Sequence, residues 1–166
     1  LGASDGEYPG QSRSASLSDG HVVFTKLNGF ASRRQKITDP LAVQVSASAQ
    51  KANRALLSGE EFYLGGSQFG RAFDSGEISA DDGAAVSFEV QYGEFLSKPY
   101  LDSYQFYGFY DAGVVFEIEE DVFSAGAAVL SAGGGLRLGL TKTLFAGLEV
   151  AKPLNRAVSN EGDKGP

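Results

Sequence analysis

The 166-residue sequence contains no cysteine, methionine or tryptophan, and it has a single histidine. Without cysteine, the chain can form neither a disulfide bond nor a thiolate metal site. The lone histidine, His21, has no partner with which a metal cluster or catalytic triad could be assembled. No nucleophile, general base or cofactor motif is recognisable elsewhere. We therefore expect a protein that is not an enzyme and that binds no cofactor or metal.

The sequence also lacks a run of about 18 apolar residues, so it predicts no membrane-spanning helix. Its net charge of -7 argues against a nucleic-acid partner, which would need a basic surface. A transmembrane β-barrel remains possible, because lipid-facing and lumen-facing residues alternate along each of its strands. The overall hydropathy of such a barrel stays near neutral.

Apolar and polar residues alternate along much of the chain, which predicts strands rather than helices. In residues 41–50, Leu41, Val43 and Val45 fall on one face, and the residues between them fall on the other. The same pattern predicts six strands, near 21–35, 41–50, 85–92, 104–116, 136–140 and 144–151. A length of about 10 residues is typical of strands that cross a bilayer at a tilt.

The predicted connections alternate between short and long. Tight turns are expected at 38–40, 96–101 and 141–143, whereas the longer polar loops are 1–20, 51–83, 117–124 and the segment from Asn155 onward. Short turns at one end and long loops at the other are typical of outer-membrane barrels. A soluble β-sandwich is the alternative, because its loops also alternate. We predict an all-β fold, with a soluble β-rich binding module as the second possibility.

Two charged residues need an explanation. Arg71 lies in a long glycine-rich loop, and Asp111 lies on the polar face of the strand 104–116. A carboxylate facing lipid would cost a few kcal/mol, so Asp111 is expected to face the lumen of a barrel. A charge-assisted pair between the two side chains would account for both. The same alternation assigns three further charges to the lumen as solvated groups: Glu89, Arg137 and Glu149.

Other conspicuous residues have simpler interpretations. The run Gly133-Gly134-Gly135 lacks the lysine and hydroxyl residue of a phosphate-binding loop. Inside a strand, such glycines allow a neighbouring backbone or an inserted loop to approach closely. The acidic groups in the loops lack the spacing of a calcium-binding loop, and we interpret them as solvated surface charges. They are Glu60-Glu61, Asp81-Asp82 and the acids of 117–121.

Several segments, in this order, resemble the C-terminal barrel of the two-partner secretion transporters, the haemolysin-activator-like (TpsB) family. They are LGASDGEYPGQSR (1–13), the stretch 46–85, YGFYDAGVVF (107–116), LSAGGGLRLGL (130–140) and LFAGLEVAKPL (144–154). The resemblance implies a 16-stranded barrel in the bacterial outer membrane, preceded by POTRA domains. Residues 1–166 would supply its tenth to fifteenth strands. The last strand would follow Pro166, and the POTRA domains would lie upstream of Leu1.

The resemblance also implies site residues. The family's loop commonly reads Val-Arg-Gly-Tyr or Val-Arg-Gly-Phe, and here the sequence is Gly-Arg71-Ala72-Phe73. The family's strand motif, aromatic-x-Asp-x-Gly, matches the segment that holds Asp111 and Gly113. By this resemblance the loop near 52–83 folds back into the lumen, where Arg71 pairs with Asp111. Ala72 replaces the family's glycine and would be strained if its φ were positive.

The function that the resemblance implies is translocation without chemistry. Its partners would be a large secreted exoprotein, the lipid of the outer membrane and the upstream POTRA domains. A barrel-assembly insertase of the same superfamily shares the loop and strand motifs. These residues therefore leave the insertase open as an alternative to the secretion transporter.

Overall fold

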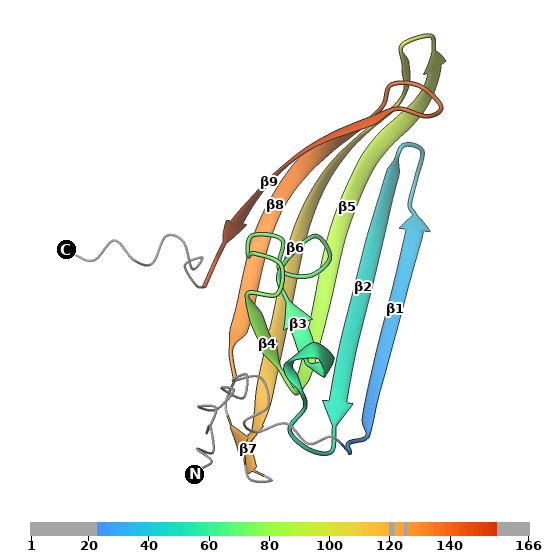
Figure 1. Cartoon of the computed structure of the whole chain (residues 1–166). Helices are drawn as coiled ribbons and strands as arrows, with labels where there is room; N and C mark the ends of the chain where they lie inside the picture. The colour runs from blue at the N-terminus through green and yellow to red at the C-terminus, as the bar shows by residue number, and fades with distance from the viewer. Residues whose placement is uncertain (1–22, 120–121, 125, 156–166) are drawn as a thin grey trace, which may run out of the picture.

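The computed structural model describes residues 23–119, 122–124 and 126–155. The predicted loop 1–20 and His21 lie outside these residues. Six long antiparallel strands form one sheet in the order β1-β2-β5-β6-β8-β9 (Figure 1). Their bounds are β1 Lys26–Lys36, β2 Leu41–Ala52, β5 Asp82–Lys98, β6 Leu101–Glu119, β8 Ala128–Gly139 and β9 Phe145–Pro153. The short strand β7 (Val122–Ser124) pairs with the end of β6. The predicted all-β fold with six antiparallel strands is confirmed.

Two strands are much longer than the alternation predicted. β5 has 17 residues and β6 has 19, and they pair until only Pro99 and Tyr100 remain between them. The prediction of a turn over 96–101 was therefore too wide. β8 begins at Ala128, well before the predicted 136, because the small residues from Ser131 to Gly135 show no alternation of bulky side chains.

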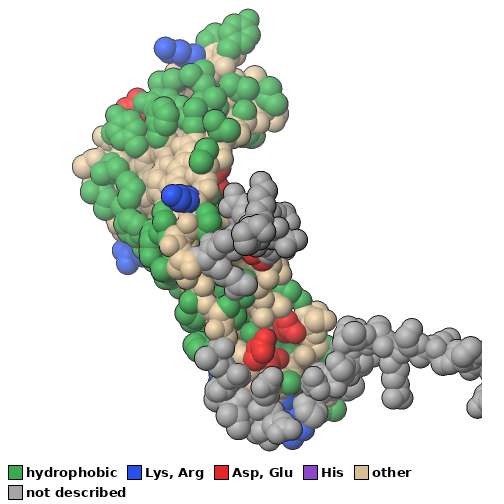
Figure 2. All heavy atoms as spheres, turned by 90° about the vertical axis from the view of Figure 1, so that its left-hand side faces the viewer, with side chains coloured by type: hydrophobic (Ala, Val, Ile, Leu, Met, Phe, Trp, Pro, Cys, Tyr) green, Lys and Arg blue, Asp and Glu red, His purple; other side chains and the backbone are tan. Residues whose placement is uncertain are grey.

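The sheet has two chemically different faces. On β5, the apolar side chains of Val86, Phe88 and Val90 are exposed, whereas Ser87 and Glu89 between them are buried. We call the face that carries Glu89 and Asp111 the inner face and the opposite face the outer face. Figure 2, viewed from the β9 side, shows hydrophobic side chains gathered over much of the sheet. An outer face of this kind requires an apolar environment or partner.

The connection from β2 to β5, residues 53–81, folds back onto the inner face (Figure 1). It contains a 3₁₀ turn, η2 (Ser58–Glu60), and a small hairpin of β3 (Phe62–Leu64) and β4 (Ile78–Ala80). The core lies between this loop and the sheet. Its loop residues are Phe62, Leu64, Phe69, Phe73, Ile78 and Ala80, and its sheet residues are Ala85, Val115 and Val129.

Hydrophobic burial therefore drives the docking of the loop. Burying a side chain such as that of Phe62 or Leu64 contributes about 1.5–3 kcal/mol.

Within the part of the chain that the structure describes, no helix is long and apolar enough to cross a membrane.

Candidate functional site

Arg71 binds Asp111 through both its side chain and its backbone. Its Nε and Nη2 donate to the two carboxylate oxygens of Asp111, each at 3.1 Å, and its backbone N–H donates to Oδ2 at 3.1 Å. A bidentate arginine–carboxylate pair of this kind fixes geometry as well as charge. The added backbone bond fixes the path of the loop at this residue. The structure thus brings together the loop arginine and the strand aspartate.

Asp111 is fully buried, with 0 % of its surface exposed, and two serines complete its hydrogen bonds. Ser87 of β5 donates its hydroxyl at 2.7 Å, and Ser131 of β8 donates at 3.4 Å. Ser87 also accepts a bond from Arg71 Nη2 at 2.9 Å. A buried charge is tolerated only when it is paired and hydrogen-bonded in this way.

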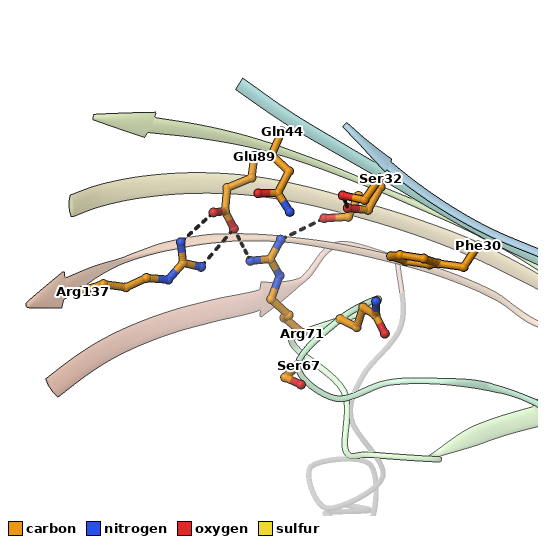
Figure 3. Close-up of a pocket in the computed structure, with 10 residues that line it drawn as sticks. Phe30, Ser32, Gln44, Ser67, Arg71, Glu89 and Arg137 are labelled. Atoms are coloured by element: carbon orange, nitrogen blue, oxygen red, sulfur yellow. Dashed lines mark hydrogen bonds and ion pairs between the residues drawn. The ribbon is translucent and has the colours of Figure 1, made fainter. Parts of the chain in front are cut away.

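Glu89, Arg137 and Glu149 belong to the same network, although the sequence suggested separate solvated charges. Glu89 accepts from Arg71 Nη1 at 2.7 Å and from Arg137 Nη1 at 2.8 Å, so it bridges the two arginines (Figure 3). Glu149 lies 3.7 Å from Arg71 Nη1 and accepts a hydrogen bond from the Tyr107 hydroxyl at 2.7 Å. We call the contacts of Arg71 with Asp111, Ser87 and Glu89 the tip anchor.

Two aromatic rings of β6 stack against the guanidinium groups of Arg71 and Arg137. The Arg71 guanidinium lies 3.5 Å from the centroid of the Phe109 ring, and that of Arg137 lies 3.6 Å from the Tyr107 ring. A Cβ on Gly133 would come within 2.6 Å of Phe109, and one on Gly135 within 2.5 Å of the Tyr107 hydroxyl. The glycines of β8 therefore make room for the rings, which adds a side-chain role to the close backbone approach expected from the sequence.

Phe73 and Gly113 belong to the apolar contact between the loop and the inner face of the sheet, next to the tip anchor. Phe73 is buried in the core between loop and sheet. A Cβ on Gly113 would come within 2.8 Å of Leu64, which belongs to the same core. The strand glycine thus leaves space for a loop side chain. Gly83 does the same for Phe62, since a Cβ there would lie 2.2 Å from that ring.

The backbone around Arg71 explains why alanine is accepted at position 72. Gly65, Gly66 and Gly70 have positive φ, at 102°, 88° and 78°, so the loop makes its left-handed turns at glycine. Among the described residues, Ser97 is the one non-glycine residue with positive φ. Ala72 is not among the residues with positive φ and is therefore unstrained.

The surroundings of Arg71 favour the charged form of its guanidinium. Burial by itself would lower the pKa of the Arg71 guanidinium, but hydrogen bonds from it to Asp111 and Glu89 outweigh this effect and raise the pKa above its ordinary value. Opening of the tip anchor requires both charged groups to find other partners or water.

A second set of contacts holds the base of the loop. Asp81 accepts from the backbone N–H groups of Leu56, at 2.5 Å, and Ile118, at 2.8 Å. Asp82 accepts from the Ala52 N–H at 2.6 Å and pairs with the Lys51 ammonium at 2.5 Å. We call these contacts of Asp81 and Asp82 the base anchor.

The interpretation of Asp81 and Asp82 as solvated surface acids was wrong. Only 7 % of Asp81 and 4 % of Asp82 is exposed. Their carboxylates satisfy backbone amides that the small apolar cluster of Ala52, Leu56 and Ile118 shields from water. Sequence alone gave no signal for this, because the amides belong to segments far from the acids along the chain.

A cavity of about 340 Å³ lies between the loop tip and the inner face (Figure 3). Its lining comes from β1, β2, β5, β8 and the loop: Phe30, Ser32, Gln44, Ser46, Ser67, Gln68, Arg71, Ser87, Glu89 and Arg137. The described residues contain no group of three side chains suited to hold a metal ion. The charged groups of the site are paired with one another, and they hold the loop on the sheet.

A sheet with an apolar outer face, and with a loop folded onto its polar inner face, is typical of outer-membrane barrels whose interior is plugged by a loop. The family described as haemolysin secretion/activation protein ShlB/FhaC/HecB matches residues 5–138. The chain belongs to this family, whose members are outer-membrane secretion transporters of bacteria rather than a class of enzymes.

Among curated proteins, the heme/hemopexin transporter protein HuxB of Haemophilus influenzae is 28% identical to the chain over 142 residues. HuxB of the H. influenzae strain ATCC 51907 / DSM 11121 / KW20 / Rd is also 28% identical over 142 residues. The matches cover 82% of this chain and 25% of each relative, so the chain spans about a quarter of their length. No solved structure matches the chain.

Proposed function

We propose that this chain is part of an outer-membrane translocation pore that secretes a large partner exoprotein in two-partner secretion. The observation that carries the proposal is the family match over residues 5–138, a range that contains both the Arg71 loop and Asp111. The six strands would cross the membrane as part of a 16-stranded barrel, with their apolar outer face against lipid. The inner face would then line the lumen.

The loop 53–81 would lie in the lumen as a plug or gate, held there by the tip anchor. Its docking by Arg71, Phe73 and Gly113 supports this role, because the loop presents a charge and an apolar surface to the same strands. Upstream POTRA domains would receive the exoprotein, which would cross in extended form and fold outside. Folding outside supplies a driving force that needs no nucleotide.

The deciding experiment compares the medium and the outer membrane of bacteria with and without the gene. We expect one or two large exoproteins to disappear from the medium while the other outer-membrane barrels keep their abundance. A broad fall in outer-membrane barrels would instead identify an insertase and would refute the secretion proposal. Unchanged proteomes in both fractions would refute both functions.

A single substitution tests the role of the tip anchor in secretion. We expect Arg71→Ala to reduce secretion of the exoprotein more than it reduces the amount of barrel in the outer membrane. Arg54→Ala is the matched control, since Arg54 is an exposed arginine of the same loop. Quantitative immunoblots of medium and membrane provide the readout. Equal losses of secretion and barrel would mean that the pair serves barrel stability alone.

A further inference from the structure

The loop covers only one part of the inner face. Its apolar residues pack on Ala85 of β5, Val115 of β6 and Val129 of β8. Toward β1 and β2 the loop tip stands away from the sheet, and the cavity of about 340 Å³ occupies the space between them. In Figure 3, the labelled strand residues Ser32 and Gln44 lie on the opposite side of this space from the loop residue Ser67.

The cavity is lined mainly by uncharged polar side chains. We call the following residues the polar wall: Ser32, Gln44 and Ser46 of the strands, with Ser67 and Gln68 of the loop. Hydroxyl and amide groups both donate and accept hydrogen bonds. The charged residues at the same cavity, Arg71, Glu89 and Arg137, are paired with one another. The wall therefore offers hydrogen bonds without selecting for the charge of its occupant.

This chemistry suits an extended polypeptide better than a small organic ligand. An extended chain presents a backbone donor and acceptor at every residue, about 3.3 Å apart, whatever its side chains are. Sites for small organic molecules are mostly apolar, with few polar groups. Among the described residues that line this cavity, Phe30 is the one apolar side chain.

The size of the cavity supports the same occupant. A volume of about 340 Å³ is at the lower end of the range of about 300–1,000 Å³ that is typical of ligand sites. It admits a short piece of extended chain while the loop stays docked, but it excludes a folded domain. A polar surface also holds such a chain weakly, because each hydrogen bond replaces one with water.

We propose that the polar wall is the contact site for the unfolded exoprotein in transit, which passes between the docked loop and strands β1 and β2. The inference rests on the proposed secretion function and adds the side of the lumen that the substrate touches. The tip anchor need not open for this passage, because Arg71 bonds to residues of β5 and β6 and not to the strand residues of the wall on β1 and β2.

Site-specific photo-crosslinking in the full-length transporter tests the proposal. A benzophenone side chain is placed in the transporter at Gln44 or Ser46. The same cells make the exoprotein that disappears from the medium when the gene is deleted. This exoprotein is fused to a stably folded domain, which stalls it in transit. Val45 is the matched control, because it lies between them on the same strand but on the outer face. Gln105 of β6, which accepts a hydrogen bond from Arg137 and does not line the cavity, tests the inner face outside the polar wall.

We expect crosslinks to the exoprotein from Gln44 and Ser46, and none from Val45. Crosslinks from Gln105 alone, with the exoprotein still secreted, would overturn the polar wall as the contact site and leave the secretion function intact. If gene deletion removes no exoprotein from the medium, the secretion function itself fails, which is a separate result.

A pair of substitutions gives a second readout. Gln44→Leu makes the wall apolar, and we expect it to slow secretion several-fold while barrel abundance is unchanged. Val45→Ala, on the outer face, should leave the secretion rate unchanged. Equal secretion rates in the Gln44→Leu variant and the wild type would contradict the proposal.

Discussion

The two anchors of the loop differ in the groups that they join. The tip anchor joins mainly side chains to side chains, with Arg71 shared between Asp111 and Glu89, and it includes one bond from the Arg71 backbone N–H to Asp111. The base anchor joins the carboxylates of Asp81 and Asp82 mainly to backbone amides. Ion pairs can separate and re-form without a change of backbone, whereas a backbone amide released from its acceptor alters the path of the chain. The comparison indicates a loop that is releasable at its tip and fixed at its base.

The surroundings of the anchors point the same way. The tip anchor borders a polar cavity, where water can replace either partner of the ion pair. The base anchor lies beside the apolar cluster of Ala52, Leu56 and Ile118. Loss of an acceptor there leaves buried donors without water. Four substitutions, in order of decreasing expected effect, test this difference.

The largest effect is expected from Arg71→Ala. Its loss leaves Asp111 and Glu89 as buried carboxylates without their shared cation, and breaking a buried pair in this way costs about 3–5 kcal/mol. Hydrogen exchange of residues 65–76 in the full-length protein should accelerate strongly, while exchange at 52–57 stays slow. Arg54→Ala should change neither segment. Equal acceleration of both segments would show that the two anchors are not independent.

A smaller effect, at the base of the loop rather than at its tip, is expected from Asp81→Ala. The change orphans the buried amides of Leu56 and Ile118, at a cost of about 1–3 kcal/mol for an unsatisfied group. Amide exchange should accelerate at these two residues and not at Arg71. Asp74→Ala is the control, because Asp74 is an exposed acid of the same loop. Faster exchange at Arg71 would contradict the assignment of separate anchors.

Gly113→Ala tests the apolar contact between the anchors. The added Cβ would lie 2.8 Å from Leu64, so the loop or Leu64 must shift, which costs about 1 kcal/mol as a mild case of overpacking. Gly108→Ala on the same strand meets nothing closer than 3.8 Å and serves as the control. Protease sensitivity of the loop should rise for Gly113→Ala. Equal sensitivity of the two variants would remove Gly113 from the docking surface.

The smallest effect is expected from Ala72→Gly, which restores the family's residue. Because Ala72 has no positive φ, glycine relieves no strain here and only increases the freedom of the undocked loop, by about 0.5 kcal/mol. Loop exchange should be slightly faster than in the wild type. A slower exchange would show that position 72 prefers a left-handed conformation.

The alternation in the sequence predicted the face of Asp111 and Glu89, because period two along a strand fixes which side chains share a side. It did not predict that Glu89 would bridge Arg71 and Arg137, since register between neighbouring strands is not visible in one strand. Asp81 and Asp82 were misread for a related reason. Their partners are backbone amides of distant segments, and the residue type does not reveal which backbone amide donates to a side chain.

The aromatic rings beneath the arginines have a consequence for the evolution of the chain. Gly133, the Phe109 ring and Arg71 are stacked in that order, so a larger residue at position 133 would displace the ring on which the arginine rests. The three positions should therefore vary together among homologues. A relative with a bulky side chain at position 133 should carry a smaller one at 109, and its loop should be held by other means.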